Sequence, residues 1–317
     1  MSPSAQRYLI ALAVLLAAAL LWPGCAQGQD PRPPSGDAAQ APAGPAPPTP
    51  TPAPPPPEWT ALEDRLAQVV AASPVEGRFA VAVMDLQTGH LLSVNGSRPQ
   101  RAGCVVNLFV LLTVMRDVAA GRYPLETVDA LLDQTIWSSN SVTARELYGI
   151  AGEGDVLDGL RRVRALIHGI PGVRQTVLDH PPSFVDETLG VSVDNLVTAE
   201  DAVHALAALY HGRILEEPWR TDMLDRLTAV YSGLNYLLAS VPADAVSHKN
   251  GYYYEPLDGT WVDNDIGIVR FRRGGQEYAY AMAFLSEGVP VELADVTLGQ
   301  RVARLVWEYF QEAYPRA

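Results

Sequence analysis

The sequence is poor in basic residues and almost without lysine. It has 23 Lys and Arg against 36 Asp and Glu, a formal net charge of −13, and Lys249 is its single lysine. With no basic patch to meet phosphates, this composition argues against a nucleic-acid partner. Arginine supplies the solvated positive charges elsewhere, so the one lysine is a candidate for a role that needs a compact ammonium with an adjustable pKa. Chance is the alternative explanation.

Cysteine is also scarce, with only Cys25 and Cys104 in the chain. Because Cys25 is expected to be lipidated or removed, Cys104 would have no disulfide partner. An unpaired thiol in an oxidising compartment is a liability unless it is buried or used. An inert buried thiol is the common case, and a chemical role is the alternative.

No apolar run reaches the ~20 residues that a membrane-spanning helix needs. Tyr8 to Trp22 is apolar, follows Arg7 and ends at Pro23, which predicts an export signal over residues 1–25. Gly24-Cys25 is similar to the end of a bacterial lipobox, whose cysteine is lipidated; a plain secretory cleavage is the alternative. We therefore expect an extracytoplasmic, cell-envelope protein that meets the membrane only through this signal or a lipid anchor.

A proline-rich segment separates this signal from the globular region. Residues 31–57 carry 13 of the 26 prolines, so residues 26–57 are predicted to form a stiff, extended spacer. An SH3-type ligand is the alternative. Residues 58–317 are rich enough in apolar residues for one large domain, and the acidic surface gives no sign of a large apolar patch. A monomer is expected.

The stretch from Arg101 to Asp117 predicts a buried helix. Leu108, Leu111 and Met115 recur at helical spacing, and valine, leucine and phenylalanine fill most of the other positions. Cys104 lies at its first turn, where the peptide dipoles favour an anion.

The remaining pattern predicts an α+β fold with one antiparallel sheet of about five strands flanked by helices. A hairpin comes first and a strand meander last, with a helical subdomain over about 104–240 between them. Helices are expected at 59–70, 125–136, 142–150, 160–167, 198–209, 217–231, 234–238 and 293–310, and strands at 78–86, 90–94, 246–253, 261–271 and 277–285. In the loop 170–194, His180 with Asp179 and Glu187 lacks metal-ligand spacing, so no metal and no cofactor are expected.

Three short stretches occur in a suggestive order: Cys104-Val105-Val106-Asn107, Ser138-Ser139-Asn140 and Lys249-Asn250-Gly251. They resemble the S-x-x-K, S-D-N and K-T-G motifs of the class A β-lactamases and penicillin-binding serine hydrolases. The resemblance covers about Glu58 to Ala317 and implies a β-lactamase/transpeptidase-like fold. It also implies acyl transfer from β-lactam or peptidoglycan-peptide-like ligands.

The resemblance further implies roles for individual residues. Ser138 would relay a proton to the leaving nitrogen, and Asn140 would hold the substrate's amide side chain. Lys249 would supply positive potential for the substrate carboxylate, beside Asn250, which replaces the usual threonine or serine, and Gly251. Glu187 is the only glutamate in the loop from Leu178 to Asn195, where the family carries its deacylating glutamate.

Two departures affect the expected chemistry. Cys104 stands at the serine position and Asn107 at the lysine position, and no S-x-x-K occurs anywhere in the chain. An amide cannot take a proton from a thiol, and loss of a general base typically costs ~10²–10⁴ in rate. A thiol is nevertheless a strong nucleophile. The sequence thus leaves two hypotheses: an impaired hydrolase that uses Cys104, or a non-catalytic envelope-binding or scaffold pseudoenzyme.

Overall fold

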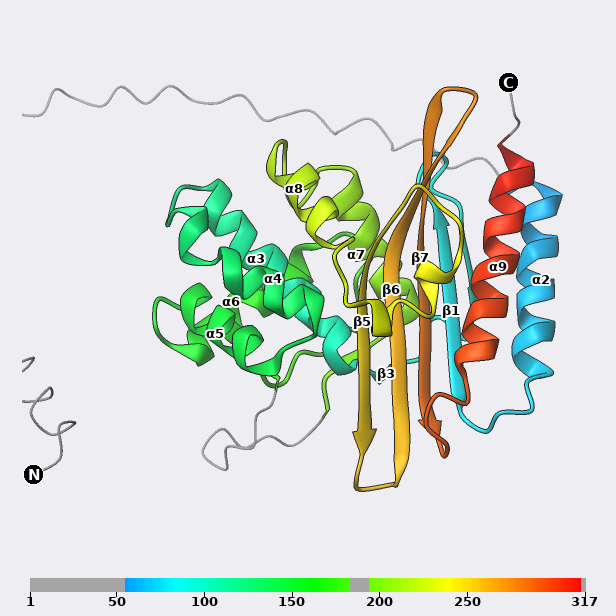
Figure 1. Cartoon of the computed structure of the whole chain (residues 1–317), viewed down its shortest axis with the longest axis horizontal. Coiled ribbons are helices and arrows are strands. Elements are labelled where there is room, and N and C mark those ends of the chain that lie inside the picture. The colour runs from blue at the N-terminus through cyan, green and yellow to red at the C-terminus, as the bar shows by residue number, and fades with distance from the viewer. Residues whose placement is uncertain (1–54, 183–193, 315–317) are drawn as a thin grey trace, which may run out of the picture. The chain divides into compact units, whose positions relative to one another are not determined.

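A five-stranded antiparallel sheet separates two layers of helices in the computed structural model, which describes residues 55–182 and 194–314 (Figure 1). The strand order is β2-β1-β7-β6-β5. The strands are β1 (Arg78–Asp85), β2 (Leu91–Val94), β5 (Ala245–Glu255), β6 (Thr260–Arg273) and β7 (Gln276–Val289). The predicted fold class, with the early hairpin joined to the late meander, is confirmed.

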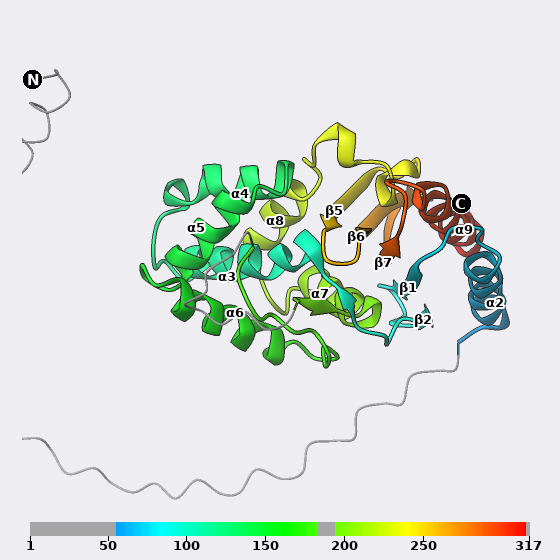
Figure 2. The ribbon, with the colours of Figure 1, turned by 90° about the horizontal axis from the view of Figure 1, so that it is seen from below.

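Helices cover both faces of the sheet (Figure 2). On one face α2 (Pro57–Ala71) packs beside α9 (Val296–Ala313), and on the other α7 (Ala199–Tyr210) lies against β1, β6 and β7. Because both faces are covered, β1 is buried along nearly its whole length and reads as a continuous apolar run rather than an alternating one. The sheet therefore divides the interior into two apolar cores.

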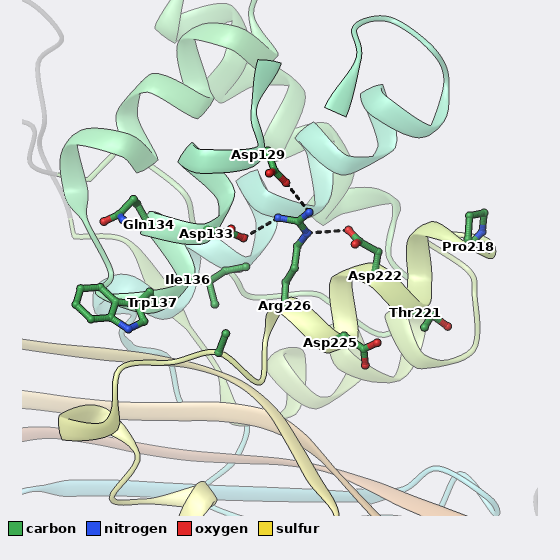
Figure 3. Close-up of a pocket in the computed structure, with 11 residues that line it drawn as sticks. Asp129, Asp133, Gln134, Ile136, Trp137, Pro218, Thr221, Asp222, Asp225 and Arg226 are labelled. Carbon is green, nitrogen blue, oxygen red and sulfur yellow. Dashed lines mark hydrogen bonds and ion pairs between the residues drawn. The ribbon is translucent and has the colours of Figure 1, made fainter. Parts of the chain in front are cut away.

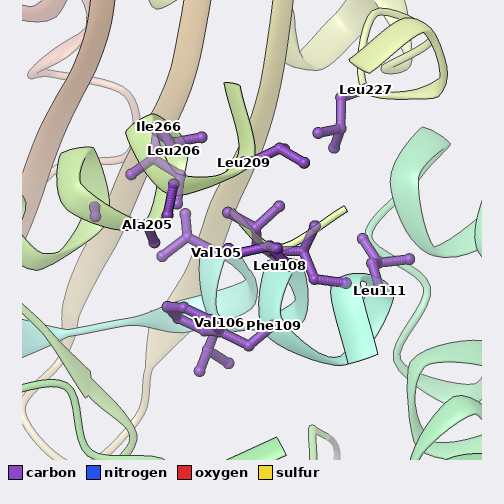
Figure 4. Close-up of a cluster of buried hydrophobic side chains, with 14 of the residues drawn as sticks. Val105, Val106, Leu108, Phe109, Leu111, Ala205, Leu206, Leu209, Leu227 and Ile266 are labelled. Carbon is purple, nitrogen blue, oxygen red and sulfur yellow. The ribbon is translucent and has the colours of Figure 1, made fainter. Parts of the chain in front are cut away.

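The helix predicted from the apolar run is the centre of the second layer. The 3-10 turn Gly103–Val106 leads into α3 (Asn107–Ala119), and every residue from Leu108 to Met115 is at most 5% exposed. Its apolar residues form one cluster with those of α7 and with Ile266 of β6 (Figure 4). The surrounding helices are α4 (Asp129–Trp137), α5 (Ser141–Ala151), α6 (Val156–Gly169) and α8 (Trp219–Arg226).

The structure differs from the prediction after α8. The helix expected over 217–231 ends at Arg226, and 3-10 turns at Ser232–Leu234 and Leu238–Ser240 replace the helix expected over 234–238. The Leu227 carbonyl instead accepts a hydrogen bond from the His248 N–H of β5, at 2.9 Å. Tertiary pairing with an edge strand thus ends a helix that local periodicity would have continued. A small sheet of β3 (Gln100–Arg101) and β4 (Leu196–Val197) was also not predicted.

Among the described helices, none is both long and apolar enough to cross a membrane. The predicted signal, Cys25 and most of the proline-rich spacer lie outside the described residues.

Candidate functional site

Cys104 lies where the start of the helical turn meets strand β5. A Cβ added to Gly251 would lie 2.8 Å from the backbone nitrogens of Cys104 and Val105, so only glycine allows this approach of strand and helix. The Asn264 amide donates to the carbonyls of Arg101 (2.7 Å) and Ala102 (3.1 Å). These contacts fix the backbone just before the thiol, which is partly exposed.

Lys249 reaches the same place from β5 and is completely buried. Its ammonium donates to the Ser139 hydroxyl and to the Asn250 carbonyl, the latter at 2.8 Å. Burial lowers the pKa of Lys249 to about 8, while Cys104 and Asp265 act in the opposite direction. The sole lysine is therefore close enough to Cys104 for the two side chains to interact electrostatically.

Ser139, not Ser138, is the serine that lies against Lys249. Ser139 has a φ of +53°, and its carbonyl oxygen lies 4.0 Å from Cys104 Sγ. The Ser138 hydroxyl instead donates to the Gln134 carbonyl at the end of α4, at 3.2 Å. The serine beside Lys249 is thus the residue after the one singled out from the sequence.

The cap of α5 explains this shift. Asn140 Oδ1 accepts the N–H groups of Val142 (2.9 Å) and Thr143 (3.2 Å), which satisfies the start of the helix. That oxygen is therefore engaged with the backbone instead of facing a ligand. Ser141, the next residue, lines the cleft beside Cys104.

Asn107 is held in α3 one turn after Cys104 and is completely buried. Neither side-chain atom, Oδ1 or Nδ2, has a hydrogen-bond partner among the described residues. A buried amide without partners is costly, and native structures contain few of them. Asn107 therefore lies near the thiol but carries no group that can take its proton.

A cleft with a volume of about 290 Å³ opens beside Cys104. The residues lining it are Gly103, Cys104, Val106, Ser141, His180, Pro182, Asp194, Asn195 and Tyr253. Asn250 lies on the Ser139 side, where its Oδ1 is 3.4 Å from the Ser139 hydroxyl. The structure thus brings together Cys104, Lys249, Asn250 and Gly251 of the residues singled out from the sequence.

Glu187, proposed for deacylation, lies outside the described residues. Within residues 55–182 and 194–314, no group of three or more His, Cys, Asp or Glu side chains is arranged to hold a metal ion.

A second polar cluster lies behind the cleft. His248 Nδ1 is 2.8 Å from Asp265 Oδ1, in a fully buried contact. Further along β6, Asp263 accepts the Tyr236 hydroxyl at 2.9 Å, and its other oxygen has no partner among the described residues. Burial and the nearby Asp295 raise the pKa of Asp263 to about 8.

The larger hollow, of about 910 Å³, lies between α4 and α8, away from the thiol (Figure 3). Arg226 at its centre pairs with Asp129, Asp133 and Asp222 at 2.6 to 2.8 Å. Its lining has no thiol and no serine hydroxyl, so we place the candidate site at Cys104 despite the smaller volume there.

Sequence reasoning missed Ser139, Ser141, Asn195 and Tyr253, and it considered His180 only as a metal ligand. The run Ser138-Ser139-Asn140-Ser141 can be aligned in two registers one residue apart. Recognising Asn140 as the helix cap would have selected the correct register. The other residues are distant in the chain and reach the cleft only by folding.

Comparisons with known proteins identify a matching family and similar folds. A model described as the beta-lactamase enzyme family matches residues 61–144 and 127–310. A search of curated proteins finds no match.

Solved structures show the same fold at low sequence identity. A class A beta-lactamase from Bacteroides cellulosilyticus has 18% identity and a TM-score of 0.67, over 80% of this chain and 98% of its own. A beta-lactamase from Chitinophaga pinensis has 19% identity and a TM-score of 0.64, over 79% and 100%. PBP-A has 18% identity and a TM-score of 0.63, over 80% and 97%.

Proposed function

We propose that this chain, which belongs to the beta-lactamase enzyme family, is an acyl-transfer domain in which Cys104 takes up the acyl group of a β-lactam or a peptidoglycan-peptide-like amide. The observation that carries the proposal is the convergence of Cys104, Ser139 and the fully buried Lys249, which lies in the middle of β5. Among the similar structures, one is an acyl-enzyme complex of a PBP-A mutant with penicillin G.

Each group has a role in the proposed reaction. The Cys104 thiol gives its proton to an acceptor in the cleft, its sulfur attacks the amide carbonyl carbon, and the carbonyl oxygen becomes an oxyanion. The Cys104 backbone N–H, at the start of a helical turn where such groups lack a partner within the helix, is the donor we assign to that oxyanion. Ser139, hydrogen-bonded to Lys249, passes a proton to the departing nitrogen. The carbon–nitrogen bond breaks, leaving a thioester.

Lys249 also suits the recognition of an anionic ligand. Its ammonium is buried against Ser139 and Asn250, beside the partly exposed thiol. A pKa of about 8 leaves Lys249 predominantly protonated at pH 7 and able to exchange a proton. We propose that it attracts a ligand carboxylate in its charged form.

We propose that turnover is slow. Asn107 takes the place of the family's lysine, and its amide cannot act as a base. A thioester would therefore accumulate if water cannot be activated at the rate at which the thiol attacks. Glu187 remains the deacylating residue suggested by the resemblance.

The proposal is tested by intact mass after incubation with a penicillin and a cephalosporin. We expect each probe to add its own mass to the wild type, and peptide mapping to locate the adduct on Cys104. The matched control is Cys104→Ala, which should stay unmodified. An unmodified wild type, or equal labelling of the control, would refute the proposal.

A non-catalytic binding role is the second candidate. The fully buried amide of Asn107 favours it, because this amide has no hydrogen-bond partner within residues 55–182 and 194–314 and replaces the group that activates the nucleophile in the family. Restoring both motif positions, Cys104→Ser with Asn107→Lys, separates the two candidates. Fast hydrolysis by the double variant would show that the site has kept a catalytic shape, and no hydrolysis would favour the binding role.

We also propose that the chain is exported and held at the envelope through its N-terminus. The support is the apolar run that ends at Gly24-Cys25 and the proline-rich spacer after it. Palmitate labelling in a bacterial host tests the lipid anchor: wild type should be labelled and Cys25→Ala should not. Equal labelling, or none in either, contradicts lipidation at Cys25.

A further inference from the structure

We propose that His180 is the proton acceptor for the Cys104 thiol, so that a thiol–imidazole pair replaces the serine–lysine pair of the family. This inference rests on the proposed function for its substrate, but the pairing itself can be tested without one. Both residues line the same cleft of about 290 Å³. A nucleophile and a base that face one small cavity are the minimum that nucleophilic catalysis requires.

The hydrogen bonding of His180 determines which ring nitrogen can accept a proton. His180 Nδ1 lies 2.9 Å from the Pro181 carbonyl oxygen. A carbonyl can only accept, so Nδ1 carries the proton in this contact. In the neutral ring Nε2 then keeps its lone pair, which is the state that a general base needs.

Asn195 forms hydrogen bonds with the backbone near His180 and with the backbone near Cys104. Its side-chain oxygen accepts the Asp179 and His180 N–H groups at 2.7 and 3.2 Å, and its amide donates to the His180 carbonyl at 2.8 Å. Its own carbonyl accepts the Ala102 N–H at 2.8 Å, two residues before Cys104. One residue thus fixes both the loop that carries the base and the loop that carries the nucleophile.

Arg164 of α6 also holds the backbone of the segment that leads to His180. Its guanidinium donates to the Leu178 carbonyl at 2.5 Å and to the Asp179 carbonyl at 2.8 Å. The backbone leading to His180 is therefore held on both sides, by Asn195 and by Arg164. A base positioned by such contacts loses little entropy when the reaction begins.

The other charged and titratable groups around the pair have separate partners. Lys249 and Ser139 contact each other on the β5 side of the thiol. On the cleft wall, Asp194 pairs with Arg101 at 3.1 Å, and burial raises the pKa of the Tyr253 phenol. Asp194 is thus engaged with Arg101, and Tyr253 stays un-ionised at neutral pH.

Two different groups then carry out the two proton transfers. His180 Nε2 takes the proton from the sulfur as the carbon–sulfur bond forms, and Ser139 protonates the leaving nitrogen as the carbon–nitrogen bond breaks. The proton then passes from His180 through solvent to Ser139, so that both groups return to their starting protonation states and the acyl group stays on the sulfur as a thioester.

The test measures the reactivity of Cys104 toward iodoacetamide, which needs no recognition of a β-lactam. At pH 6.5 we expect His180→Gln to be alkylated ~10-fold more slowly than wild type, because a paired imidazole maintains thiolate below the usual thiol range. At pH 9.5 the rates should converge, because the thiol then ionises without help. His168→Gln, on the exposed end of α6, is the matched control and should follow the wild type.

Equal alkylation of wild type and His180→Gln at pH 6.5 would overturn the pairing. If His180→Gln does not fold, the pH profile of Lys249→Met provides the test, because the nearby ammonium of the wild type would also favour the thiolate. Alkylation of Lys249→Met should persist well below pH 8, and a rate that falls ~10-fold per pH unit below pH 8, as for an isolated thiol, overturns the pairing. Failure of β-lactam labelling with His180-dependent alkylation would refute only the proposed substrate class.

Discussion

Two polar clusters, each with a buried ionisable group, lie on opposite faces of the sheet, and burial shifts the pKa values of these two groups in opposite directions. The cleft cluster is Cys104, Ser139 and Lys249, and the acid cluster is Asp263, Asp295 and Tyr236. Alternation along a strand explains the separation, because Lys249 pairs with Ile266 in the helical core whereas Asp263 pairs with Tyr252. Burial lowers the pKa of Lys249 to about 8 and raises that of Asp263 to about 8.

The same desolvation therefore favours the neutral form of each group and gives the two clusters opposite pH dependences. For Asp263 the folded state binds the proton more tightly than the unfolded state. The contribution of this proton to stability is therefore complete below the unfolded pKa and is lost as the pH rises through about 8. For Lys249 the unfolded state binds the proton more tightly, so its contribution to stability increases with pH from about 8 toward 10.5. Only the cleft cluster includes a nucleophile, and we assign function to that face alone.

The largest expected effect comes from removing the charge of the cleft cluster. Lys249→Met should slow formation of the Cys104 adduct by ~10²–10³-fold, because a buried ammonium near the reacting atoms stabilises developing negative charge. Time-resolved intact mass measures this rate, with circular dichroism as the check on folding. A folded variant that labels at the wild-type rate would remove Lys249 from the reaction.

Removing the charge of the acid cluster should change stability instead. Asp263→Asn should increase the free energy of unfolding at pH 8–9 by about 2–4 kcal/mol, because the wild-type carboxyl must lose its proton without a cationic partner at that pH. The difference should shrink toward pH 4, where both are neutral. Urea unfolding at the two pH values measures it, and a constant difference would contradict the assignment of the pH dependence to Asp263.

A pair of adjacent serines tests the register of the cleft cluster. Ser139→Ala should slow acylation by ~10–100-fold, because it removes the hydroxyl between Lys249 and the leaving group, a loss in the lower part of the range for proton-transfer groups. Ser138→Ala, whose hydroxyl bonds only to a helix end in the described structure, should stay within ~2-fold. The reverse order of effects would return the role to Ser138.

The smallest effect is expected where charges are exposed. Arg226→Gln breaks three ion pairs in the hollow between α4 and α8, but the carboxylates there are 36% to 60% exposed (Figure 3). Solvent-screened pairs contribute about 0–1 kcal/mol each. We expect a loss of at most ~2 kcal/mol, reduced further by salt. Thermal unfolding with and without 0.5 M salt measures this loss, because the Debye length is only ~4 Å at that concentration. A larger loss of stability that does not depend on salt would show that the hollow is more deeply buried in solution.

Much of the fold could be predicted from local pattern. The period of Leu108, Leu111 and Met115 predicts the buried helix, and it is buried on all sides. The hairpin and late meander predict the single antiparallel sheet. The prediction fails after Arg226, where a strand-edge hydrogen bond from His248 competes with helix continuation. Periodicity in a short window cannot detect a partner that lies twenty residues further on.

The candidate site was predicted in outline and misread in detail. Short motifs predicted that Cys104, Lys249 and Gly251 lie near one another, and in the structure the middle of β5 packs against the turn that carries Cys104. They also selected Ser138. Short motifs cannot choose between two adjacent serines, because the choice depends on which of the two the cap of α5 directs toward Lys249. The roles assigned to Asn107 and Glu187 stay predictions.

By itself, the amino-acid sequence determined the arrangement of helices and strands, the single thiol and the single lysine, because periodicity and residue identity are local properties. Only the tertiary structure decided that Ser139 faces Lys249 and that His180 shares a cleft with Cys104. It also decided that Asp263 loses its contact with water. These depend on contacts between segments far apart in the chain, and burial, which changes the chemistry of each group, exists only after those segments have packed together.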